Sequence, residues 1–103
     1  MATTEDFIAY VTAQIASAGR IRTRKMFGEY MVYVDEKPVL TVCDNTVFVK
    51  ITGQSAALLP DAETGYPYEG AKECYILDLD DSEAATNIVR ALADAMPLPK
   101  KKQ

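Results

Sequence analysis

Histidine is absent from this chain of 103 residues, and its absence removes several classes of active site. A Ser-His-Asp triad, a Cys-His pair and a His-ligated zinc site all need an imidazole. Tyrosine, lysine, aspartate and glutamate remain as acids or bases, but no spacing of these residues matches a catalytic motif. We therefore expect no enzyme, no catalytic residue, no bound metal and no cofactor.

Cysteine is scarce as well, since Cys43 and Cys74 are the only two. Two thiols alone do not make a structural zinc site. In a reducing compartment, two thiols far apart in the sequence are usually ordinary core residues. We adopt that interpretation; the alternatives are a redox pair or a reactive thiol.

Long apolar stretches are missing too. No run approaches the roughly 20 residues that a membrane-spanning helix needs. The start of the chain, Met1 to Asp6, is acidic and polar. It therefore lacks the basic and apolar regions of a signal peptide. These observations predict a cytoplasmic protein without a membrane partner.

The chain is acidic overall, with a net charge of −4 and an isoelectric point near 4.7. Duplex DNA binding needs a basic footprint, so direct DNA binding is not expected. Basic residues nevertheless cluster at Arg20, Arg22, Arg24 and Lys25, whereas residues 61–83 are strongly acidic. Such a charge dipole can steer a partner protein, although a simply solvated surface is the plainer interpretation.

The length and the apolar content of 49% fit one folded domain, residues 1–103, with a short basic tail from Pro97. Periodicity and turn residues predict a helix at 3–18, strands at 30–34, 39–43 and 47–51, a short helix at 54–59, a strand at 74–77 and a helix between Asp80 and Pro97. Short polar turns join the first three strands and force antiparallel neighbours. We therefore predict an α+β fold of order α-β-β-β-α-β-α, with helices packed on an antiparallel sheet. The second face of that sheet is too apolar to be fully hydrated, which suggests a homodimer.

Local signals mark the ends of the helices. Thr3 and Asp80 have the chemistry of N-caps, with an acidic residue three positions later. Gly19 suits a left-handed turn at the end of the first helix. The apolar stripes expected to face the sheet are Phe7, Val11, Ile15 and Ala18 in the first helix and Ala85, Ile88, Leu92 and Ala95 in the last.

A set of short motifs carries a family resemblance. The chain reads Arg-Lys-Met-Phe-Gly-Glu-Tyr at 24–30 and Tyr-Val-Asp at 33–35, followed by Leu-Pro-Asp-Ala at 59–62 and Pro-Tyr-Glu-Gly-Ala-Lys at 67–72. In this order, and over residues 7–96, the sequence resembles the N-terminal domain of the TfoX competence-regulator family, including its standalone bacterial members.

The resemblance implies a sheet of four to five strands in a secretion-chaperone-like arrangement, with the additional short strand within Tyr66 to Lys72. Better-known members of the family regulate natural competence together with a cyclic-AMP receptor protein, and they carry a second, helical C-terminal domain. The sequence reaches Gln103 with no helical segment of that kind after the last helix, so we expect no second domain here. What the resemblance implies here is the fold and a non-catalytic role through interaction, rather than the competence role itself.

The Met-Phe-Gly motif at 26–28 has two interpretations. The first is structural: the two apolar side chains fill the core where the chain enters the sheet, and the glycine permits a tight backbone. The second is a site for an anionic ligand, with Arg22, Arg24 and Lys25 on its rim and Phe27 as its apolar floor. We favour the structural interpretation and keep these residues as a candidate binding site.

The loop from Tyr66 to Lys72 is the second candidate site. Tyr66 and Tyr68 flank a proline, and tyrosine in such a loop is typical of recognition surfaces because it buries area at a low entropy cost. The alternative is that both rings cover an end of the core.

Asp78, Asp80 and Asp81 lie close together and invite comparison with a metal site. Their spacing lacks the glutamate and the glycine of a calcium-binding loop. Helix capping and solvation explain them better, so no metal ligand is assigned.

We predict a regulatory or protein-interaction domain that acts on a protein partner. The alternative is a small-molecule or nucleotide-binding domain, or a weak enzyme, that uses the basic segment next to Met-Phe-Gly. A concave pocket around Phe27 would favour the alternative, and a closely packed Phe27 would favour the interaction domain.

Overall fold

The computed structural model describes residues 3–26 and 29–96. Its elements are α1 (Glu5–Gln14), η1 (Ala16–Ala18), β1 (Ile21–Met26), β2 (Glu29–Val34), β3 (Lys37–Cys43), β4 (Thr46–Lys50), α2 (Gly53–Leu58), β5 (Thr64–Gly65), β6 (Cys74–Ile76) and α3 (Ser82–Ala95). All strands belong to one antiparallel sheet of order β1-β2-β3-β4-β6-β5. The predicted α+β class and antiparallel sheet are confirmed, but the sheet has six strands where four to five were expected.

Two strands account for the difference. β1 forms from the basic segment, which was not predicted to be a strand, and pairs with β2 over all six of its residues. Charged side chains are common on such an edge strand because they keep it from pairing with other chains. β5 consists of Thr64 and Gly65 alone, so the additional short strand lies just before the segment 66–72 in which it was expected.

Tight turns with positive φ connect the central strands. Asp35 and Glu36 join β2 to β3 with φ of 51° and 70°, and Asp44 and Asn45 join β3 to β4 with φ of 49° and 55°. Two consecutive residues of positive φ are the signature of a type I′ hairpin turn, whose twist matches that of the strands. Aspartate and asparagine enter this region more readily than most residues. These turns make the strands antiparallel neighbours, as the sequence predicts.

The helix caps have the predicted chemistry but lie one residue later. Thr4 rather than Thr3 caps α1, and Asp81 rather than Asp80 caps α3. Each side chain accepts a hydrogen bond from the backbone N–H three residues on, at 3.1 Å in both helices. Thr3 is buried instead, where its hydroxyl donates to the carbonyl of Val42 at 3.4 Å. Because two identical residues stand side by side at each helix start, only such a tertiary contact decides which one caps.

The first helix is also shorter than predicted. α1 ends at Gln14 and a 3₁₀ turn, η1, follows it. Gly19 then has φ of 152° and ψ of −156°, which is not the left-handed helical turn we expected. This extended region with positive φ is essentially restricted to glycine.

A cluster of polar groups surrounds Gly19. The carboxylate of Asp35 accepts hydrogen bonds from the backbone N–H of Arg20 and from the guanidinium of Arg90, both at 2.9 Å. Arg90 also donates to the carbonyl of Ala18 at 2.8 Å. Through these bonds α3 is tied to η1 and to the β2–β3 hairpin.

One apolar core lies between the sheet and the helices. Some residues of the predicted helix stripes are buried in this core, but elsewhere the buried side of the helix is the neighbouring residue. In α1, Ile8 is buried whereas Phe7 is only half-buried. In α3, Val89 is fully buried, Ile88 is half-buried and Ala95 is exposed. Adjacent apolar residues leave the direction of a stripe open, and the packing of the helix on the sheet decides it.

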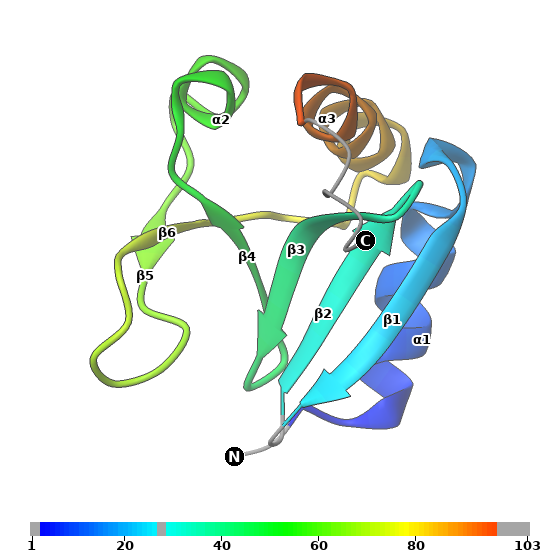
Figure 1. Cartoon of the computed structure of the whole chain (residues 1–103), viewed down its shortest axis with the longest axis horizontal. Helices are drawn as coiled ribbons and strands as arrows, with labels where there is room; N and C mark the ends of the chain where they lie inside the picture. The colour runs from blue at the N-terminus through cyan, green and yellow to red at the C-terminus, as the bar shows by residue number, and fades with distance from the viewer. Residues whose placement is uncertain (1–2, 27–28, 97–103) are drawn as a thin grey trace, which may run out of the picture.

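The helices lie on one face of the sheet, and we call the opposite face the open face. In Figure 1, α2 and α3 lie above the sheet, and the loop between β5 and β6 extends at the lower left, away from both. Cys43 and Phe48 are only 5% and 6% exposed, yet neither belongs to the core on the helix side. The strand register places Phe48 opposite Thr41, and Thr41 opposite Met31, on the open face. The open face is therefore partly covered, in agreement with the expectation that it is not fully hydrated.

Within the described residues, no helix is both long enough and apolar enough to cross a membrane.

Candidate functional site

β1, at one edge of the sheet, carries the basic residues that the sequence singled out. Side chains alternate between the two faces of a strand. Ile21 packs against the core, so Arg22 and Arg24 lie on the open face and Lys25 on the other. The basic cluster is therefore divided between the two faces of the edge strand.

Arg22 has partners within the protein. Its guanidinium lies over the ring of Tyr33, 4.2 Å from the ring centroid. The same group donates two hydrogen bonds to the carboxylate of Glu36, at 3.1 and 3.3 Å. Such an exposed pair adds little stability, but Glu36 and the ring of Tyr33 engage the guanidinium and offset its charge. Arg22 is thereby less available to an anionic ligand than the sequence suggests.

Arg24 and Lys25 are exposed, and neither forms an ion pair within residues 3–26 and 29–96. They provide positive charge at the edge of the open face. Phe27, the predicted floor of the ligand site, lies outside the described residues, as does Gly28.

The loop between β5 and β6 presents the tyrosines of the second candidate site to solvent. Tyr66 and Tyr68 are 64% and 57% exposed, so neither ring covers an end of the core. Tyr68 and Pro67 instead line a groove of about 540 Å³ together with Met26 and Met31 of the open face. The structure thus connects the two candidate sites, because the residue that precedes Phe27 and the exposed loop border one groove.

This groove, which we call the open-face groove, combines an apolar interior with charges of both signs. The residues that line it are Met26, Glu29, Met31, Thr41, Lys50, Ile51, Pro67, Tyr68, Ala71, Lys72, Glu73 and Cys74. Two lysines and two glutamates occur among them, so the groove does not select strongly for an anion or a cation. Such a mixture is typical of a surface that contacts another polypeptide.

The sequence interpretation missed several of these residues, Glu29 and Met31 among them. Glu29 and Met31 follow from the register, since Met26 lies opposite Glu29 and Arg24 opposite Met31. The signal that could have found them is the alternation of side chains between the two faces along residues 21–26. It was not recognised because this strand is polar at most positions and so shows no apolar alternation.

The two cysteines are free thiols on the open face, and both have a raised pKa. Burial, followed by the hydrogen bond from the Cys43 thiol to Glu29 at 3.4 Å, raises the pKa of Cys43 to about 12. Burial also raises the pKa of Cys74. Reactive cysteines have a lowered pKa. Both thiols therefore stay protonated at neutral pH, although only Cys43 is buried and Cys74 is half-buried, and neither belongs to the main apolar core.

Each of the three clustered aspartates has a local role. Asp81 caps α3, the side chain of Asp78 accepts the N–H of Asp80 at 2.9 Å, and Asp80 accepts the hydroxyl of Tyr10 at 3.0 Å. That last bond raises the pKa of Tyr10. Over the described part of the chain, no group of three or more acidic or cysteine side chains is placed to hold a metal ion.

Comparison with known proteins agrees with the fold and with the motifs. The TfoX N-terminal domain family matches residues 13–94. A protein of Spirochaeta aurantia, described as an uncharacterized 12.7 kDa protein in the trpE 5′ region, is 37% identical over 102 residues. That match covers 97% of this chain and 89% of the relative. The chain therefore belongs to the TfoX N-terminal domain family.

Proposed function

We propose that this domain is a non-enzymatic, regulatory interaction module that binds a protein partner through the open-face groove and the loop between β5 and β6. The observation that carries the proposal is the exposure of Tyr66 and Tyr68, at 64% and 57%, in a loop whose Tyr68 lines a groove with an apolar interior. Membership in the TfoX N-terminal domain family supports it, because the resemblance implies a role through interaction.

The chemistry of the loop supports the choice of a protein as the partner. Tyrosine combines a large apolar ring with one polar group and is enriched among residues that dominate binding energy. Pro67 restricts the backbone between the two rings, which lowers the entropy lost when they are fixed against a partner. Arg24 at the far edge of the sheet adds a positive charge that favours an acidic region of the partner.

A small-molecule site is less well supported. Arg22 is engaged with Glu36 and with the ring of Tyr33 rather than directed toward a bound anion. The open-face groove also carries charges of both signs. A nucleotide site would be expected to concentrate positive charge and backbone N–H groups on the phosphates.

The proposal is tested by affinity capture of the tagged protein, expressed at native level, from its own cell lysate. Tyr68→Ala should lose a stoichiometric partner, and Arg24→Ala should weaken its capture. Tyr10→Ala is the matched control, because Tyr10 is a partly exposed tyrosine, at 39%, on a helix on the other side of the sheet. With the partner purified, Tyr68→Ala should raise the Kd by about tenfold or more, the range of interface hot spots.

An unchanged partner set for a folded Tyr68→Ala variant would contradict the proposal. A second copy of the chain is one form the partner can take, and light scattering at high concentration tests it directly. A dimer that Tyr68→Ala dissociates would identify the open face as its interface, whereas a monomer at every concentration would remove the homodimer from the proposal.

A further inference from the structure

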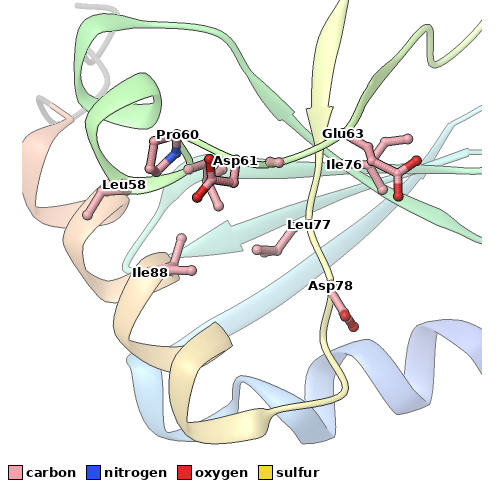
Figure 2. Close-up of a pocket in the computed structure, with 10 residues that line it drawn as sticks. Leu58, Pro60, Asp61, Glu63, Ile76, Leu77, Asp78 and Ile88 are labelled. Carbon is pink, nitrogen blue, oxygen red and sulfur yellow. The ribbon is translucent and has the colours of Figure 1, made fainter.

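A second groove lies on the other side of β6 from β4, between α2, α3 and the segment that joins α2 to β5. Its volume is about 610 Å³. Figure 2 shows Leu58 of α2 and Ile88 of α3 toward one end of this groove, and Leu77 and Asp78 along the chain that leaves β6. None of the residues of the open-face groove lines it.

The lining of this groove is apolar in its interior and acidic at its rim. The residues are Leu58, Leu59, Pro60, Asp61, Ala62, Glu63, Ile76, Leu77, Asp78 and Ile88. The only charged residues among them are the three carboxylates, all of which are exposed. We call this site the acid-rimmed groove.

These carboxylates are not neutralised within the described part of the protein. Asp61 and Glu63 take part in no side-chain hydrogen bond or ion pair among those residues, and Asp78 accepts only the backbone N–H of Asp80. They are also not gathered to chelate one ion, since the described residues hold no metal-binding cluster. Separate negative charges along a groove match a ligand with several cations spread along its length.

Among the described residues, the chain that follows β6 has unpaired backbone groups beside this groove. On the edge away from β4, the N–H of Ile76 donates to the carbonyl of Glu63 at 2.8 Å, and the N–H of Leu77 donates toward β4, to the carbonyl of Val47 at 2.9 Å. In an extended strand, backbone groups two residues apart point to the same side. The N–H and C=O of Asp78 thus face the same side as those of Ile76, and neither has a backbone partner among the described residues.

Past the end of β6, residues 77–79 belong to no strand, but their burial still alternates as it does in one. Leu77 and Leu79 are 5% and 4% exposed, whereas Asp78 between them is exposed, which is the alternation of a strand. The pairing of β5 with β6 stops before it reaches Asp78, because the chain before Thr64 leads back to α2. An edge of this kind can accept a strand from another chain.

We propose that the acid-rimmed groove binds an extended, basic peptide segment of a partner protein, which adds as a strand beside residues 77–79. The peptide backbone would pair with Asp78. Apolar side chains on one face of the peptide would contact Leu58 and Ile88, and lysine or arginine side chains on the other would lie near Asp61 and Glu63. This site goes beyond the proposed function, because it uses a different surface with a different charge preference.

The test uses the full chain and a defined probe, a fluorescein-labelled nine-residue peptide in which lysine and valine alternate. A peptide with glutamate in place of lysine is the charge control. Two further peptides carry N-methyl groups on all valine nitrogens or on all lysine nitrogens. Because successive N–H groups of a strand point to opposite sides, only one of the two methylated peptides should lose binding.

The protein variants separate a specific site from general attraction. Asp61→Asn with Glu63→Gln removes two rim charges, and Glu5→Gln with Glu69→Gln removes two exposed charges elsewhere. The first pair should raise the Kd of the lysine peptide about three- to tenfold and the second pair less than about twofold, in line with the strength of exposed ion pairs. Amide shifts in the titrated protein should centre on Asp78, Leu79 and Ile88.

Several outcomes would overturn this inference. If both charge-removing pairs weakened binding equally, the peptide would be attracted only by the overall charge of −4 and not by a specific site. An equal effect of the two methylated peptides, whether both bind or neither does, would contradict strand addition. Tyr68→Ala should leave the peptide affinity unchanged, so the inference and the proposed function fail independently.

Discussion

Replacement of Gly19 by alanine tests how η1, the β2–β3 hairpin and α3 are held together. With φ of 152° and ψ of −156°, Gly19 has a backbone conformation that alanine adopts only at a cost. That cost is about 1–3 kcal/mol for a residue held in such a region. A Cβ atom at this position would also lie 2.9 Å from Oδ1 of Asp35 and 3.1 Å from Nη1 of Arg90.

The contact adds to the backbone cost because the carboxylate cannot simply turn away. Asp35 is held by the N–H of Arg20 and by Arg90, so moving it breaks hydrogen bonds on both sides. We expect Gly19→Ala to lower the free energy of unfolding by at least about 1–3 kcal/mol. For a domain of this size, that corresponds to a fall in Tm of roughly 4–8 °C per kcal/mol.

Gly53→Ala is the matched control. Gly53 begins α2, its φ is not positive, and no atom lies within 4 Å of the Cβ that alanine would add. The substitution should be neutral or should stabilise the protein by about 0.4–1 kcal/mol, because alanine restricts the unfolded chain. Urea unfolding and thermal melting of both variants measure the difference.

A third variant separates the two parts of the penalty. In an Asp35→Ala background the clash with the carboxylate is gone, so Gly19→Ala should cost less there than in the natural protein; the backbone part and the contact with Arg90 should remain. Equal Tm values for Gly19→Ala and Gly53→Ala would refute the reasoning. The same penalty in both backgrounds would refute the role of Asp35.

Two further predictions follow from the perturbed pKa values. The N–H of Arg20, and then Arg90, hold the pKa of Asp35 below its ordinary value. A lowered carboxyl pKa stabilises the fold above the ordinary value and loses that contribution as the pH falls through the lowered one. As the pH is lowered below about 4, the urea concentration at the midpoint of unfolding should therefore decrease, and it should decrease more steeply than in Asp35→Asn. Identical acid profiles of the two proteins would show that this carboxylate does not contribute. For Cys43, with its pKa raised to about 12, alkylation by iodoacetamide at pH 8 in a Cys74→Ser background should be far slower in the native protein than in urea. A native rate equal to the unfolded rate would contradict the burial of this thiol.

Local patterns predicted most of the fold. β2, β3 and β4 follow from runs of β-branched and aromatic residues between polar turns, and each lies within one residue of its expected start except β3, which begins two residues earlier, at Lys37. The turns at Asp35 and Asp44 have the positive φ that their residue types allow. β1 was missed because Arg-Thr-Arg-Lys has no apolar alternation, and β5 because two residues are too short to form a pattern.

Only parts of the candidate site could be predicted from the sequence. The exposure of Tyr66 and Tyr68 is consistent with a loop that carries recognition residues. The pairing of Arg22 with Glu36 could not be foreseen, since these residues meet only once β1 is known to be a strand beside β2. That the backbone of Asp78 is unpaired within the described residues could not be predicted either, because this depends on the point at which β5 stops pairing with β6.

The sequence by itself determined the absence of imidazole chemistry, the α+β class, the hairpin turns and the family, because these depend on composition, on local conformational preference and on motif order. Only the tertiary structure decided which of two adjacent threonines or aspartates caps a helix, which side of α3 packs on the sheet, and that Met26 and Tyr68 border one groove. The physical reason is that strand register and helix packing are set by contacts between residues far apart in the chain. A local pattern leaves several such arrangements nearly equal in free energy, and the packed core selects one of them.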